Sequence, residues 1–276
     1  MCMKTCASSH IFILSIISII FSSCESTGKS NVLKHAENLP YLGMNGKIDS
    51  IIVRTYTADS IEGRLEISVP TNETVQVFDA DGRVIQKVEK DFLMMASMKT
   101  DVLETKDGRI IKYSEITGRG DSSVINLVKI EGNTEYWVDT LHGGDSIFTD
   151  TILVEYKDKS RLTSFRMYNK GQIVTRSSEE IFNDKGHVIE ATRVTGAIET
   201  HNKWRHNEDG TVESIERKIF EEYIPEGSTE FKKGMLMSKK VTYVYKKDEN
   251  GNWTQAIELE GERPQAYLKR DIFYRK

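Results

Sequence analysis

The chain has 276 residues, with 38 lysines and arginines against 42 aspartates and glutamates, for a formal net charge of −4. A nucleic-acid-binding protein normally carries an excess of basic residues on one face, so this balance argues against a nucleic-acid partner. Hydrophobic residues make up 38% of the chain, which excludes a polyacidic disordered protein. The composition therefore predicts a folded domain after the first residues.

The N-terminus has the pattern of an export signal. Lys4 precedes an apolar run from Ile11 to Phe21. A helix needs about 20 apolar residues to cross the hydrocarbon core of a membrane, so this run is too short for a transmembrane anchor. It fits the core of a signal peptide, and we expect residues 1–23 to be removed on export.

A cysteine follows this signal, in the order Phe21-Ser22-Ser23-Cys24. The segment resembles the lipobox of bacterial lipoproteins, in which the peptide is cut before the cysteine and the cysteine sulfur carries a diacylglycerol. The resemblance implies lipid attachment at Cys24, contact with the membrane through that lipid, and a location in the cell envelope at the outer membrane. An ordinary secretory signal followed by an unmodified Cys24 is the alternative.

Cysteine usage fits an exported chain that keeps a thiol only where one is needed. Cys2 and Cys6 would leave with the signal, so Cys24 would be the one cysteine of the mature protein. Disulfides then cannot stabilise the exported domain. The polar segment 24–45 contains glycine and proline and predicts a flexible tether, followed by a single domain over residues 46–276.

Turn signals recur along this domain at intervals of about 25 residues. Asp-Gly and Asn-Gly pairs favour tight hairpins, because such turns need positive φ at their central residues. A second set of turn signals lies between them, so each repeat holds two strands. The first set comprises Asp81-Gly82, Asp107-Gly108, Gly132-Asn133, Lys159-Ser160, Lys185-Gly186, Asp209-Gly210, Lys233-Gly234 and Asn250-Gly251. The second set comprises Gly118–Asp121, His142–Asp145, Asn169–Gly171, Thr195–Asn202 and Pro225–Ser228.

Between the turns, apolar and polar residues alternate, as Leu65, Ile67 and Val69 illustrate. This period of two predicts strands with one buried face. We therefore expect an all-β fold, an antiparallel β-meander of repeated hairpins. About sixteen strands exceed what a twisted open sheet holds without curling, so the sheet should be strongly coiled or rolled. A closed β-barrel and propeller-like blades are the alternatives.

One segment has the apolar spacing of a helix. In Asp91–Val102, the residues Phe92, Met95 and Met98 recur at helical intervals. An irregular strand with a return loop accounts for this segment equally well.

Several turns share a finer pattern, with an aromatic residue four positions before the glycine and an aliphatic residue two positions after it. Phe78 to Val84 and Phe182 to Val188 follow the pattern, and His206 takes the aromatic position of another turn. These segments resemble YD repeats, the Tyr-Asp-x-x-Gly-x-Leu units of RHS-type proteins, and the resemblance spans most of residues 46–276. It implies a β-repeat fold more than an activity. RHS repeats build shells around cargo, and this chain is too short for such a shell.

Catalytic motifs are lacking in the sequence, which has no Gly-x-Ser-x-Gly elbow, phosphate-binding loop, dinucleotide fingerprint or His-Glu-x-x-His. His201 and His206 are five positions apart, which places them on opposite faces of a strand. The neighbouring glutamates Glu179-Glu180 and Glu221-Glu222 also face opposite ways, and we interpret them as surface charge. We expect no catalytic residue, no metal site and no cofactor.

The sequence therefore predicts a lipid-anchored envelope protein that acts as a binding or scaffold module. Repeated hairpins present a long surface, which suits an extended partner such as a glycan or a protein. The alternatives are an envelope hydrolase whose acidic residues meet only in the fold, and a carrier of lipids or small molecules.

The candidate ligand-binding residues are Tyr136 and Trp137. Adjacent strand residues point to opposite faces, and exposed tryptophan often dominates binding energy, so we expect Trp137 to be solvent-accessible. The alternative is that Trp137, Trp204 and Trp253 all fill the buried face as cross-strand partners.

Overall fold

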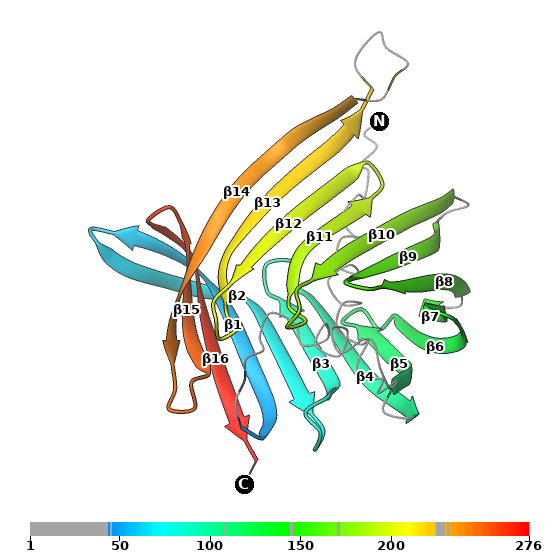
Figure 1. Cartoon of the computed structure of the whole chain (residues 1–276), viewed down its shortest axis with the longest axis horizontal. Coiled ribbons are helices and arrows are strands. Elements are labelled where there is room, and N and C mark those ends of the chain that lie inside the picture. Colours follow the sequence, from blue (N-terminus) through cyan, green and yellow to red (C-terminus); the bar gives the residue numbers. More distant parts are fainter. Residues whose placement is uncertain are drawn as a thin grey trace.

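The computed structural model describes residues 46–106, 109–143, 146–169, 172–224 and 232–275, together with Met44 and Glu230. The described part of the chain forms sixteen antiparallel strands, each paired with its neighbours in sequence, and β1 also pairs with β16 (Figure 1). The strands are β1 (Ile48–Ile61), β2 (Arg64–Phe78), β3 (Val84–Asp91), β4 (Ala96–Lys106), β5 (Arg109–Thr117), β6 (Ser122–Glu131), β7 (Thr134–Gly143), β8 (Ser146–Lys157), β9 (Ser160–Asn169), β10 (Gln172–Phe182), β11 (Val188–Thr195), β12 (Ile198–His206), β13 (Val212–Tyr223), β14 (Lys232–Lys247), β15 (Trp253–Glu260) and β16 (Arg263–Tyr274). The predicted all-β meander is confirmed, and the sheet closes into a barrel, which was one of the alternatives.

The predicted turns divide between the two ends of the barrel. Among the described residues, the first set, apart from Lys233-Gly234, joins β2 to β3, β6 to β7, β8 to β9, β10 to β11, β12 to β13 and β14 to β15 at one end, which we call the turn end. Of the second set, Gly118–Asp121 joins β5 to β6 at the opposite end, and the turn predicted over Thr195–Asn202 is limited to Gly196 and Ala197, because β12 begins at Ile198. Gly82, Gly186 and Gly210 have φ values of 79°, 81° and 84°, as the hairpin prediction requires. Gly108 lies outside the described residues.

Four turns at the turn end share one hydrogen-bond pattern. In the β10–β11 turn, the amide of Asn183 donates to the carbonyl of His187, and the amide of Gly186 donates to the carbonyl of Asn183. The Asn183 side-chain oxygen accepts from the amides of Lys185 and His187. This side chain closes the turn, which explains why aspartate or asparagine occupies the position. The same backbone pair of bonds recurs at Asp79, Asn207 and Asp248.

Of the two interpretations of Asp91–Val102, the strand with a return loop is confirmed and the helix is wrong. The segment ends β3, turns at Phe92–Met95 and begins β4. The amide of Phe92 donates to the carbonyl of Thr71, which fixes this turn against β2, and its apolar side chains are exposed. Among the described residues, no helix has the length and apolar character needed to span a membrane.

The predicted turn at Lys233-Gly234 is also wrong, because both residues lie inside β14. Gly234 pairs with Glu221 of β13. A Cβ atom on Gly234 would lie 3.0 Å from the ring of Tyr223. The glycine therefore allows a close approach of this ring and does not form a turn.

Two clusters of buried apolar side chains are found among the described residues on the inside of the barrel, and further buried residues such as Phe182 and Val241 belong to neither. One gathers side chains from β5 to β8 around Tyr113 and Trp137. The other gathers side chains from β1, β2, β15 and β16 around Ile51 and Trp253. Because each cluster belongs to neighbouring strands, each stabilises one section of the wall.

Candidate functional site

Alternate residues of the strands form a buried face, which we call the inner wall. In β10, Arg176, Glu180 and Phe182 are buried, whereas Glu179 between them is exposed. Cross-strand pairing continues this face around the barrel, for example from Lys87 through Thr100 and Glu115 to Ser123. These four residues are all buried although all are polar. The inner wall is therefore where side-chain chemistry is concentrated.

The outer face carries ion pairs between neighbouring strands. In β1, Arg54 Nε lies 2.8 Å from Glu73 Oε2 of β2, and Arg54 Nη1 lies 2.8 Å from Asp271 Oδ2 of β16. Charges of both signs on one face are typical of a surface in contact with water. Further pairs on this face are Lys90–Glu73, Lys99–Asp101, Lys203–Glu190, Lys218–Glu216, Lys233–Glu199 and Lys269–Asp271.

The inner wall of β9 to β11 carries a basic patch, formed by Arg161, Arg176, Arg193 and Glu180. Arg161 donates to Glu180 through Nε at 3.1 Å and through Nη2 at 2.5 Å. Arg193 Nη2 lies 4.0 Å from the other oxygen of Glu180. Two guanidinium groups, those of Arg161 and Arg193, thus lie at the Glu180 carboxylate, whereas Arg176 lies four residues before Glu180 along β10.

Arg176 differs from the other two arginines. Its side chain is 4% exposed, and its Nε and Nη1 have no hydrogen-bond partner among the described residues. Burial lowers the pKa of Arg176 below its ordinary value. A buried guanidinium without a carboxylate is costly, so an anion at this position would be stabilising.

The inner wall of β3 to β8 is acidic in contrast. Burial, with the charges of Asp139 and Glu89 added, raises the pKa of Glu115 to about 8. Burial and the charge of Asp150 raise the pKa of Asp139 to about 6, although a hydrogen bond with Ser123 opposes this shift. Glu115 is therefore protonated at neutral pH.

The acidic cluster of Glu89, Glu115, Asp139 and Asp150 is the arrangement that the hydrolase alternative would need. The fold does bring together carboxylates that are far apart in sequence, and a neutral carboxyl beside an ionised one is a pairing that hydrolases use. Glu115, however, is 8% exposed and stands beside Tyr113 in the core cluster of β5 to β8. Because it lies within the packed apolar core of these strands, we interpret the acidic residues as part of the wall.

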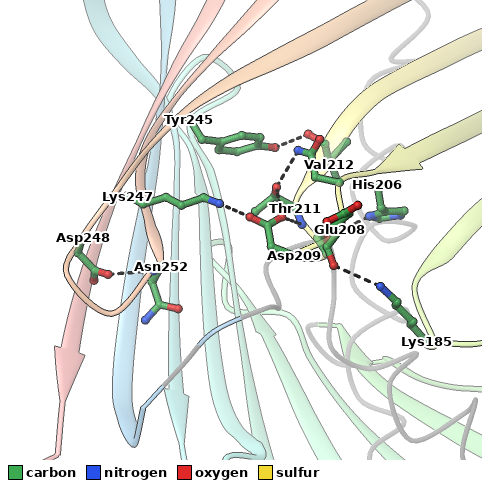
Figure 2. Close-up of polar contacts among 12 residues, drawn as sticks. Lys185, His206, Glu208, Asp209, Thr211, Val212, Tyr245, Lys247, Asp248 and Asn252 are labelled. Atoms are coloured by element: carbon green, nitrogen blue, oxygen red, sulfur yellow. Dashed lines mark hydrogen bonds and ion pairs between the residues drawn. The ribbon is translucent and has the colours of Figure 1, made fainter.

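Polar side chains link successive turns at the turn end (Figure 2). Lys185 of the β10–β11 turn donates to the carbonyl of Glu208 at 3.2 Å. Lys247 of β14 forms an ion pair with Asp209 of the β12–β13 turn. Although burial opposes the shift, hydrogen bonds from Lys247 and Thr211 lower the pKa of Asp209 to about 2. These links hold neighbouring hairpins in register.

A shallow pocket of about 390 Å³ lies between the β10–β11 and β12–β13 turns. The rings of His187 and His206 lie in it with their centroids 4.9 Å apart. The two ring nitrogens of His206 lie 3.2 Å and 2.8 Å from the carbonyl oxygens of Gly210 and Val188. The histidine thus ties the two turns together, which is a structural role.

The two histidines predicted to face opposite sides do so. His201 lies on the outer face beside Glu199 and Phe220, whereas His206 occupies the aromatic position of its turn. The described residues contain no group of three or more histidine, cysteine, aspartate or glutamate side chains that could hold a metal ion.

The prediction that Trp137 is solvent-accessible is wrong. Its side chain is 1% exposed, packs against Tyr113 with ring centroids 6.0 Å apart, and donates to Glu135 at 3.0 Å. Tyr136 points to the outer face, as expected from strand alternation, and Lys129 lies 5.6 Å from its ring centroid. A ligand contact by Tyr136 stays a prediction. Cys24 lies outside the described residues.

The interpretation of Glu180 as surface charge is also wrong. Glu179 and Glu180 do face opposite ways, but Glu180 is buried and paired with Arg161. A signal for this was present in the sequence, because Arg176 and Glu180 alternate in phase with the apolar Phe182. Charged residues in phase with buried apolar ones are thus the signal in the sequence for the basic patch.

The chain matches no protein-family model and no curated protein. Two solved structures that resemble it are described as porin-like proteins of Bacteroides. The protein from Bacteroides vulgatus ATCC 8482 is 10% identical, with a TM-score of 0.42, and the match covers 82% of this chain and 98% of the other. The protein from Bacteroides uniformis ATCC 8492 is 12% identical, with a TM-score of 0.45 and coverage of 82% and 97%. Identities this low concern the fold alone.

Proposed function

We propose that this chain is a bacterial cell-envelope protein, held at the membrane by a lipid on Cys24, whose barrel stands in water and acts as a binding module. The charged outer face is the observation that carries the proposal. A barrel that spans a membrane has an outward apolar band about 25 Å tall, and a charged side chain at mid-membrane costs about 2–4 kcal/mol. Ion pairs such as Arg54–Glu73 and Lys218–Glu216 would oppose insertion.

The inner wall supports a binding role. In a closed barrel, residues of this face point toward a common interior, so charged groups from distant strands can act on one ligand. The basic patch of β9 to β11 and the acidic cluster of β3 to β8 give that interior two chemically different sides. Selective binding requires a few well-placed polar groups of this kind.

Membrane fractionation of three full chains tests the proposal. These are the natural chain, the variant Cys24→Ala, and a chain in which a cleavable secretory signal replaces residues 1–24. Membranes are washed with alkaline carbonate, and the protein is followed in pellet and supernatant. The natural chain should stay in the pellet through its acyl chains, and the signal-exchanged chain should be released.

The two altered chains separate the lipid from the signal. Cys24→Ala can retain its apolar signal uncleaved, whereas the exchanged signal leaves no apolar segment behind. Retention of the signal-exchanged chain in carbonate-washed membranes would mean that the barrel itself holds the membrane, and the proposal would be abandoned.

A further inference from the structure

We propose that the inner wall of β9 to β11 binds an oxyanion group, the carboxylate or phosphate of a ligand that enters the barrel, with Arg176 as its main contact and Ser178 and Arg193 beside it. This inference rests on the proposed binding function and names the chemistry of its ligand.

The three side chains are neighbours on one face. Arg176 and Ser178 are successive inner-wall residues of β10, and Arg193 of β11 pairs directly with Ser178. Directly opposed residues in an antiparallel pair have Cβ atoms about 5 Å apart, and the next position on the same face is about 7 Å away. All three can therefore reach one small group.

Two of these side chains have buried polar atoms with unused hydrogen-bonding capacity. Arg176 Nε and Nη1 and the hydroxyl of Ser178 have no partner among the described residues. Buried polar atoms are nearly always hydrogen-bonded, and one that is not needs an explanation, of which a bound ion is one. A guanidinium can only donate hydrogen bonds, and the neighbouring hydroxyl can donate one as well. The two groups together therefore suit oxygen atoms that carry negative charge.

The charge balance of the basic patch also favours a bound anion. Arg161 and Arg193 both lie near Glu180, which leaves the positive charge of Arg176 without a balancing carboxylate. A bound oxyanion would supply the balance that the chain lacks, and the planar guanidinium fork matches a carboxylate or phosphate in two parallel hydrogen bonds.

The size of the barrel allows such a ligand to approach. An interior closed by eight strands is just filled by side chains, whereas barrels of sixteen strands are wide enough to hold water. The two core clusters of this barrel lie on separate parts of the wall, which agrees with a wide interior.

Thermal unfolding of the full chain with added anions tests the site. The protein is extracted from membranes in detergent, and its unfolding midpoint is followed with increasing sodium phosphate, sodium citrate, or sodium chloride at equal ionic strength. The natural chain should show a saturable rise with phosphate, with citrate, or with both, because a ligand that binds only the folded state stabilises it. A response to phosphate alone assigns a phosphate ligand, and a response to citrate alone assigns a carboxylate.

Three variants locate the effect. Arg176→Met should abolish the anion-dependent rise, and Arg176→Lys should weaken the apparent affinity about tenfold, because lysine keeps the charge and loses the fork. Arg205→Met, at an exposed position of β12, is the matched control and should respond like the natural chain. Without added anion, Arg176→Met should unfold at a higher temperature than the natural chain, because an unbalanced buried charge has been removed.

Three results would overturn the inference. One is the absence of a rise with either anion in the natural chain. Another is an undiminished rise in Arg176→Met, which would indicate a general salt effect. The third is a lower midpoint of Arg176→Met without anion, which would mean that Arg176 has a structural partner. Carbonate extraction does not involve Arg176, so each of these results leaves the proposal of a tethered barrel standing.

Discussion

The guanidinium carbon of Arg270 lies 3.6 Å from the ring centroid of Trp253. Both side chains are buried on the inner wall, one from β16 and one from β15. Tyr245 of β14 packs on the same indole with ring centroids 5.9 Å apart. Stacking on an aromatic face is thus one way in which this barrel keeps a charged group inside its wall.

This geometry predicts that Arg270→Lys destabilises the barrel. Lysine keeps the charge but cannot lie flat on the indole, so we expect a loss of about 1–2 kcal/mol in the free energy of unfolding. Urea unfolding followed by circular dichroism measures the change. Arg263→Lys, at an exposed position of the same strand, is the control and should have little effect. Equal stability of the two variants would contradict a stabilising role for the stack.

A second prediction concerns pH. The fold raises the pKa of Glu115 from 4.5 to about 8. Between these values the folded chain keeps a proton that the unfolded chain has lost, so stability should fall as the pH rises from about 4.5 to about 8, at about 1.4 kcal/mol for each unit of pKa difference.

The variant Glu115→Gln tests this assignment, because glutamine stays neutral. Its unfolding free energy should depend less on pH than that of the natural chain, and it should be the more stable of the two at pH 8. Unfolding in urea at pH 5, 6.5 and 8 gives the comparison. The exposed Glu179→Gln should follow the natural profile. Parallel profiles for all three proteins would mean that Glu115 is ionised in the fold.

A third prediction concerns the β2–β3 turn. Gly82 has a φ of 79°, and a Cβ atom there would meet nothing within 4 Å. The cost of Gly82→Ala therefore comes from the backbone alone, at about 1 kcal/mol. Gly82→Asn should cost less, because asparagine tolerates this conformation better than alanine. Thermal unfolding of both variants gives the order, and a larger loss for asparagine would argue against the turn geometry.

A fourth prediction follows from the burial of the tryptophans. Trp137 and Trp253 are buried, whereas Trp204 is half-buried. Acrylamide should therefore quench the fluorescence of a chain that retains only Trp204 more strongly than that of chains retaining only Trp137 or Trp253. Stronger quenching of the Trp137-only chain would restore the exposed tryptophan that the sequence suggested.

Local patterns in the sequence determined the strands and most of the turns. Asp81-Gly82 and Asp209-Gly210 predict hairpins because their glycines adopt a backbone conformation that few other residues tolerate. Alternation along each strand determined that Tyr136 and Trp137 face opposite sides, since strand geometry alone requires it. The pattern at Lys233-Gly234 was misleading, because that glycine makes room for the ring of Tyr223 on the preceding strand, β13.

Only the tertiary structure decided which face of the strands lies inside and what that face holds. The pairing of β1 with β16 joins residues more than 200 positions apart, and no local signal announces it. Closure buries Glu115, Arg176 and Glu180, whose charges look like surface charges in the sequence. The pKa of Glu115 and the unbalanced charge of Arg176 both depend on which neighbouring strands surround them. Burial and charge balance are properties of a closed wall, so they become visible only once the chain has folded.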